Sequence, residues 1–239
     1  FSTGAPQRVR HLDFEQGAHA TRKRYQRLRI GMDLELEQLG GRLELTVFPD
    51  AYLNSERADD LYCRISEGCA IVLIDSLRAA TPGEDENDSQ MAAWLHVLAR
   101  ASEKTGCSFL VDHHAGKPKD GHHDGRTLAR GSSAIFDACG SVFTLVGEKG
   151  KAVKVTQVKA PAEAEGGAVD DFRIRIEDVA VGDNLRAGVR IRHESDTTEA
   201  APRARKSKAD EHAAYRAAIL ELVRNTRGLR SKNMIEHEV

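Results

Sequence analysis

The chain has 239 residues, of which 40% are hydrophobic and 30% charged, and its formal net charge is −2. This composition is typical of a globular protein with a sizeable core, and the balanced charge excludes a general attraction to polyanions. The longest apolar run, Ala70–Ile74, is far shorter than the roughly 20 residues that cross a bilayer. Four cysteines without a CxxC pair favour reduced thiols, so we expect a cytoplasmic protein without a membrane span.

Strand-like and helical patterns alternate over the first two thirds of the chain. Strands are expected at Arg8–Phe14, Leu43–Phe48, Cys69–Asp75 and Cys107–Val111. Helices are expected at Ala18–Gly31, Asn54–Glu67 and Asp88–Lys104. The apolar run at Cys69–Asp75 indicates a strand covered on both faces. This alternation predicts an α/β fold with a mainly parallel sheet and helices on both faces.

The pattern changes after residue 140 to short strands joined by glycine-rich or charged turns. These strands are expected at Ser141–Val146, Ala152–Val158, Phe172–Ile176 and Val189–Arg192. They would extend the sheet with antiparallel strands or form a small β appendage. Residues 194–209 are polar and predict a linker, and Asp210–Asn225 predicts an amphipathic helix. We therefore divide the chain into a core at 1–193, a linker at 194–209 and a further segment at 210–239.

Three of the expected parallel strands end in polar residues. These are Asp13–Glu15, Asp75–Ser76 and Asp112–His114. Ligands of open parallel sheets bind beyond the carboxyl ends of the strands, so we expect these groups to meet there. A carboxylate after buried aliphatic residues, as at Asp75, suits the water shell of Mg²⁺, and Glu15 could orient an attacking water. The simpler alternatives are an aspartate that caps a turn and a solvated glutamate.

The adjacent histidines, His113 and His114, have several interpretations. One is a polar sensor that detects the γ-phosphate of a nucleotide. Another is metal ligation together with Asp112, Asp124 and the histidines at 122–123. A third is the Asp-His-His motif of the DHH phosphoesterases, which coordinate Mn²⁺. The simplest is a solvated, histidine-rich loop.

A polar loop is expected at Ala115–Ala129, with Lys117, Lys119 and Arg126 as its basic residues. Such a loop suits contact with the backbone of single-stranded DNA, although it lacks aromatic side chains for stacking. An ordinary exposed loop is the alternative. Arg130 follows it directly.

Four segments, in this order and spacing, resemble the RecA-like P-loop ATPases, specifically the AAA-family branch that contains the RepA-type plasmid helicases. The segments are His11–Gly17, Ala70–Ser76, Phe109–His114 and Arg130–Ile135. The resemblance extends over about Arg8–Val158.

The resemblance implies a role for each matching residue. Glu15 is expected to activate the attacking water, and Asp75 to be the Walker B aspartate that holds Mg²⁺ through water, with Ser76 beside it in the cofactor site. His113 or His114 would sense the γ-phosphate. Arg130 would be an arginine finger that reaches into a neighbouring subunit.

The sequence departs from this family because it has no G-x-x-x-x-G-K-[ST] motif. A βαβ unit takes roughly 30 or more residues, and only 11 precede Leu12. We therefore expect the Walker A segment upstream of Phe1; otherwise the chain would not bind nucleotide in the usual way. Residues 210–239 resemble the start of a winged-helix domain.

Together these features predict an ATPase with ATP and Mg²⁺ as cofactors, acting as a ring-forming homo-oligomer, for instance a hexamer. The expected activity is a DNA helicase of plasmid, phage or mobile-element replication that binds single-stranded DNA. One alternative is a regulatory or scaffold ATPase that assembles without unwinding DNA. A weaker alternative is a metal-dependent phosphoesterase that uses Asp112, His113 and His114.

Overall fold

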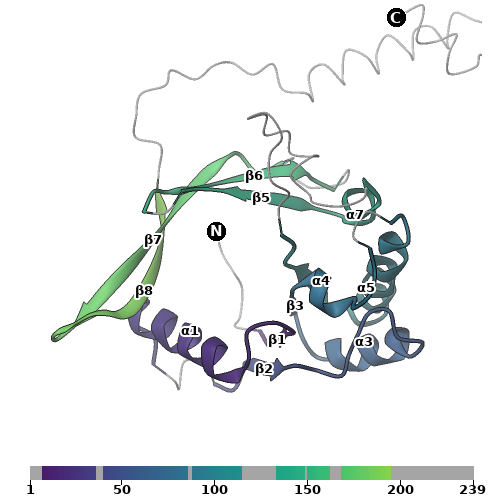
Figure 1. The fold of residues 1–239 in the computed structure, drawn as a ribbon, viewed down its shortest axis with the longest axis horizontal. Coiled ribbons are helices and arrows are strands. Elements are labelled where there is room, and N and C mark those ends of the chain that lie inside the picture. The colour runs from purple at the N-terminus through teal and green to yellow at the C-terminus, as the bar shows by residue number, and fades with distance from the viewer. Residues whose placement is uncertain are drawn as a thin grey trace, which may run out of the picture. The chain divides into compact units, whose positions relative to one another are not determined.

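The structure, a computed structural model, describes residues 7–35, 40–85, 88–114, 133–148, 150–161 and 168–194 (Figure 1). All of them lie in the first of the two units into which the chain divides, Phe1–Ser195. The basic loop with Lys117, Lys119 and Arg126, the arginine at 130, and the expected linker and C-terminal helix lie outside the described residues. Among the helices that are described, none is long and apolar enough to cross a bilayer.

The centre of the fold is a four-stranded parallel sheet in the order β2-β1-β3-β4, which agrees with the predicted α/β class. Its strands are β1 (Val9–Asp13), β2 (Leu43–Val47), β3 (Ile71–Asp75) and β4 (Ser108–Val111). In register, His11 lies opposite Leu73 and Asp13 opposite Asp75. Paired residues share a face of the sheet, so His11, Asp13 and Asp75 all project from one side.

Helices lie on both faces of this sheet. They are α1 (Ala18–Gly31), α3 (Ala58–Ser66), α4 (Leu77–Ala80), α5 (Met91–Thr105) and α7 (Ser133–Ala138). On one face, α3 and α5 pack together over a core that includes Leu12, Val72 and Ile74. On the opposite face, α1 approaches β1, where Tyr25 contacts His11.

The strand Ile71–Asp75 is not covered equally on its two faces, which corrects the expectation from its apolar run. Val72 and Ile74 are fully buried under the helices, but Ile71 is 39% exposed and Leu110 of the neighbouring strand β4 is 59% exposed. Both exposed residues lie on the α1 face, since Ile71 aligns with Val9 and Leu110 with Leu73. Within the described part of the chain, α1 lies over the β1–β2 side of that face, and its Arg24 reaches Asp75 at the carboxyl end of β3.

A separate antiparallel sheet follows, in the order β5-β6-β7-β8. Its strands are β5 (Val142–Val146), β6 (Val153–Lys159), β7 (Phe172–Val181) and β8 (Asn184–Glu194). Of the two arrangements that the sequence left open, the structure has the separate β unit. The strands β7 and β8 are longer than predicted because a turn at Gly182, with a φ of 57°, joins them into one long hairpin.

Two helix starts also differ from the sequence prediction. The helix α3 begins at Ala58, because the Asn54 side chain donates to Pro82 O and Glu84 Oε1 and caps no helix. The helix α5 begins at Met91, and Asp88 Oδ1 accepts the Gln90 N–H in the turn before it.

Candidate active site

The turn after β1 is organised by Asp13, which is fully buried. Its Oδ1 accepts the backbone N–H groups of Glu15 at 2.9 Å and Gln16 at 2.8 Å, and its Oδ2 accepts the Thr21 hydroxyl. Burial favours the protonated acid, but these hydrogen bonds outweigh it and lower the pKa of Asp13. An ionised Asp13 therefore ties the turn to the first turns of α1 and fixes where Glu15 leaves the strand.

Glu15 lies at the carboxyl edge of the sheet, between the ends of β3 and β4. Its Oε1 accepts the hydroxyl of the buried Ser76, and His114 Nε2 lies 3.7 Å from the same oxygen. Ser76 follows β3, and the peptide bond that joins it to Asp75 is cis. Thus the residues that follow three different strands meet here, as their positions at strand ends predicted.

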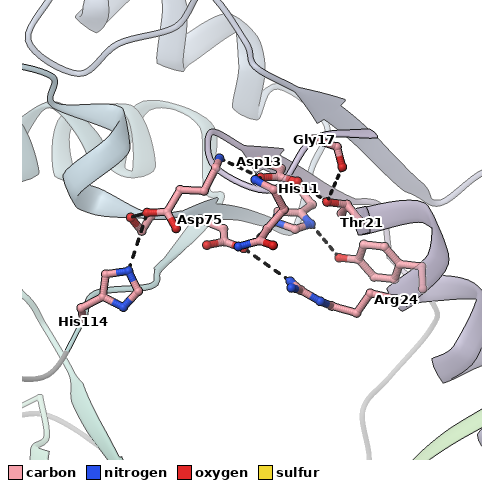
Figure 2. Close-up of polar contacts among 11 residues, drawn as sticks. His11, Asp13, Gly17, Thr21, Arg24, Asp75 and His114 are labelled. Carbon is pink, nitrogen blue, oxygen red and sulfur yellow. Dashed lines mark hydrogen bonds and ion pairs between the residues drawn. The ribbon is translucent and has the colours of Figure 1, made fainter. Parts of the chain in front are cut away.

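Asp75 lies next to this group and faces α1. Its Oδ2 is 3.8 Å from His11 Nε2 and 3.8 Å from Arg24 Nη1 (Figure 2). Burial, together with the nearby carboxylates of Asp112, Asp13 and Glu15, raises the pKa of Asp75, although His11 opposes the shift. The negative charges of these carboxylates therefore repel one another, and a bound cation would reduce that repulsion.

The donor set fits Mg²⁺ held through water better than a directly ligated metal. Mg²⁺ prefers oxygen ligands and keeps several of its waters, and carboxylate oxygens are what this edge offers. Within the described ranges, no three side chains of the His, Cys, Asp or Glu types gather so that they could hold an ion directly. Direct ligation by Asp112, His113 and His114, which a phosphoesterase would need, therefore has no support in the described part of the chain.

The candidate histidines are distinguished by their positions. His114 lies next to Glu15, as expected for a polar residue at this strand end. His113, the residue before it, is partly buried. Ser76, expected in the cofactor site, donates its hydroxyl to Glu15. The proposed nucleic-acid-binding residues and Arg130 lie outside the described residues.

Three further residues of the site were not selected from the sequence as functional: His11, Tyr25 and Arg24. The signal that could have found His11 is its spacing of two residues from Asp13 in a strand, which puts both on one face. Arg24 and Tyr25 come from α1, and their approach to β1 depends on how that helix packs.

Residues 2–120 match the model of a family described as an AAA domain. The match supports a P-loop ATPase family. The matched stretch contains β1 to β4 and therefore includes Glu15, Asp75 and His114. A search of curated proteins found no match to the chain.

Proposed function

We propose that this chain carries the hydrolytic edge of an ATP site in a RecA-like motor ATPase of the RepA type. The observation that supports it most is the meeting of Glu15 and Asp75 at the carboxyl ends of adjacent parallel strands. These strand ends are where open α/β sheets bind their ligands. The AAA domain match covers both residues, and P-loop ATPases are nucleotide-dependent enzymes.

Each residue has one task in this proposal. Glu15 orients the attacking water and accepts its proton, while the hydroxyl of Ser76 and the imidazole of His114 hold the Glu15 carboxylate in place. Asp75 holds the water shell of Mg²⁺. When bound, Mg²⁺-ATP supplies the phosphoryl group and the positive charge that stabilises its transfer. His114 is the candidate for sensing the γ-phosphate, because it approaches Glu15 directly.

The groups that cradle the phosphates would come from outside the described residues. In the described sheet β4 is an edge strand, and its Leu110 is 59% exposed. An unpaired strand edge with an exposed apolar side chain accepts a further strand. We propose that the strand and helix of a Walker A segment, upstream of Phe1 in the full-length protein, complete the sheet here.

The motor role rests on residues that the sequence alone assigns. We propose a ring-forming homo-oligomer in which Arg130 of one subunit completes the site of its neighbour. A planar guanidinium with a permanent charge suits the negative charge that develops on the transferred phosphoryl group. The basic loop at 115–129 would contact the backbone of single-stranded DNA, which gives helicase activity its substrate.

The test is ATP hydrolysis by the full-length protein with Mg²⁺, measured with and without single-stranded DNA. The proposal predicts hydrolysis that DNA stimulates and that Glu15→Gln lowers by about 10²–10⁴. The matched control is Glu67→Gln, since Glu67 is exposed at the end of α3 and precedes β3, at the end of that strand opposite Asp75. Hydrolysis that DNA leaves unchanged would favour a regulatory or scaffold ATPase. Absence of hydrolysis in the folded full-length protein would refute the proposal.

A further inference from the structure

A buried histidine stands behind Asp75. His11 is only 3% exposed, and its Nδ1 lies 2.9 Å from the hydroxyl oxygen of Tyr25. The two rings meet edge to face, with their centroids 5.7 Å apart. The other ring nitrogen, Nε2, lies 3.8 Å from Asp75 Oδ2 and has no hydrogen-bond partner among the described residues. A buried imidazole nitrogen without a partner costs free energy, so its direction requires an explanation.

The contacts of His11 select one tautomer. Nδ1 faces the Tyr25 hydroxyl, which can donate its proton to an unprotonated ring nitrogen. Nε2 faces the Asp75 carboxylate, which can only accept a hydrogen bond. The ring proton then sits on Nε2 and points at the carboxylate. The opposite tautomer would direct a lone pair at a negative charge.

The same carboxylate oxygen receives both approaches from this side. Arg24 Nη1 also lies 3.8 Å from Oδ2, so the imidazole and the guanidinium approach Asp75 at the same oxygen. A carboxylate held through one oxygen presents the other in a fixed direction.

We propose that His11 is a positioning residue: its tautomer, set by Tyr25, directs Nε2–H at Oδ2 of Asp75 and leaves Oδ1 for the Mg²⁺–nucleotide complex. This inference rests on the proposed function, because it gives Asp75 its task. It adds to that function a second layer of residues, on β1 and α1, that acts through Asp75 and touches no substrate. His11 orients the Asp75 carboxylate, so replacing His11 should affect metal-dependent nucleotide binding more than folding.

The tautomer is measured first, because it requires no ligand. Long-range ¹H–¹⁵N correlation spectra of the imidazole nitrogens, assigned by comparison with a His11 variant, report which nitrogen is protonated. We expect a protonated Nε2 and an unprotonated Nδ1. An unprotonated Nε2 would overturn the inference, because Nε2 could then donate nothing to Asp75.

Nucleotide binding provides the second test, with a fluorescent ATP analogue as probe and the full-length protein, in Mg²⁺ and in EDTA. His11→Leu should weaken binding about tenfold in Mg²⁺ and leave binding in EDTA unchanged. His11→Gln, whose amide N–H reaches about the place of Nε2, should restore affinity to within about threefold. Tyr25→Phe should weaken binding in Mg²⁺ by a smaller factor. Tyr52→Phe, at a tyrosine whose side chain is exposed, should leave binding unchanged.

The possible outcomes separate this inference from the proposed function. If His11→Leu binds as the wild type does, or loses affinity equally in Mg²⁺ and EDTA, the inference is wrong while the proposed function stands. The same holds if His11→Gln is no better than His11→Leu when both are folded by circular dichroism. If the wild type itself does not bind the probe, the proposed function fails and the inference fails with it.

Discussion

Replacing Asp13 by Asn tests how the turn that carries Glu15 is held. The carboxylate accepts three hydrogen bonds, from Glu15 N–H, Gln16 N–H and the Thr21 hydroxyl. In Asp13→Asn the amide oxygen can keep the two backbone bonds. Its NH₂ group can donate to Thr21, whose hydroxyl then turns to Gly17 O at 3.1 Å. The bonds survive in number, but each loses its ionised acceptor.

The expected loss follows from the difference between charged and neutral hydrogen bonds. A bond to a charged group contributes about 1 kcal/mol more than a neutral one, so three bonds give a loss of about 2–3 kcal/mol in the free energy of unfolding at pH 7. The pKa of Asp13 is lowered in the folded state. This stabilisation is therefore present above the unfolded value, about 3.9, and is lost as the pH falls through the folded value. The difference in the free energy of unfolding between the wild type and Asp13→Asn should therefore decrease below about pH 4.

Urea unfolding followed by circular dichroism, repeated across this pH range, measures both effects. The control is Asp50→Asn, because Asp50 is exposed and should change stability by no more than about 0.5 kcal/mol. A loss at Asp13 no larger than that of the control, or a gap that stays constant as the pH falls, would refute the reasoning.

Three further predictions follow. Replacing the three basic residues of the loop at 115–129 by Ala should weaken binding to single-stranded DNA of any sequence, and should reduce the slope of log affinity against log salt by about 0.7 per lost phosphate contact; an unchanged slope would move the DNA site elsewhere. Arg130→Ala protein mixed with Glu15→Gln protein should recover ATP hydrolysis that each variant lacks alone, because some subunit interfaces then pair an intact site with an intact arginine. If verified mixed oligomers show no recovery, Arg130 acts within its own subunit or only stabilises the fold. Tyr62→Phe should lower the free energy of unfolding by about 1–2 kcal/mol in urea titrations, because the buried Tyr62 hydroxyl donates to Ala51 O at 2.7 Å, and an unchanged stability would contradict this.

The parallel sheet and the meeting of Glu15, Asp75 and His114 could be predicted because they depend on local patterns. Alternation and apolar runs locate the strands, and parallel strands bring their carboxyl ends to one edge. No further information was needed to place polar groups there.

The contacts of His11 and Tyr25 beside Asp75 could not be predicted in the same way. His11 lies within a strand, where a histidine is more often a structural residue of the core. Tyr25 lies 14 residues away on a helix. Their contact depends on the rotation and distance of α1 over the sheet, which the helical period alone does not fix. The Ser76 hydroxyl is a similar case, because its direction towards Glu15 depends on the turn after β3 and not on residue type.

The roles of Glu15 and Asp75 are tested most directly by measuring Mg²⁺-ATP binding and hydrolysis in Glu15→Gln and Asp75→Asn variants of the full-length protein. We expect Glu15→Gln to bind Mg²⁺-ATP as the wild type does, while its hydrolysis falls by about 10²–10⁴, the contribution of a general base. Asp75→Asn should lose Mg²⁺-dependent binding as well as turnover. Near-normal hydrolysis by Glu15→Gln, in protein that binds nucleotide, would show that Glu15 does not activate water at this site.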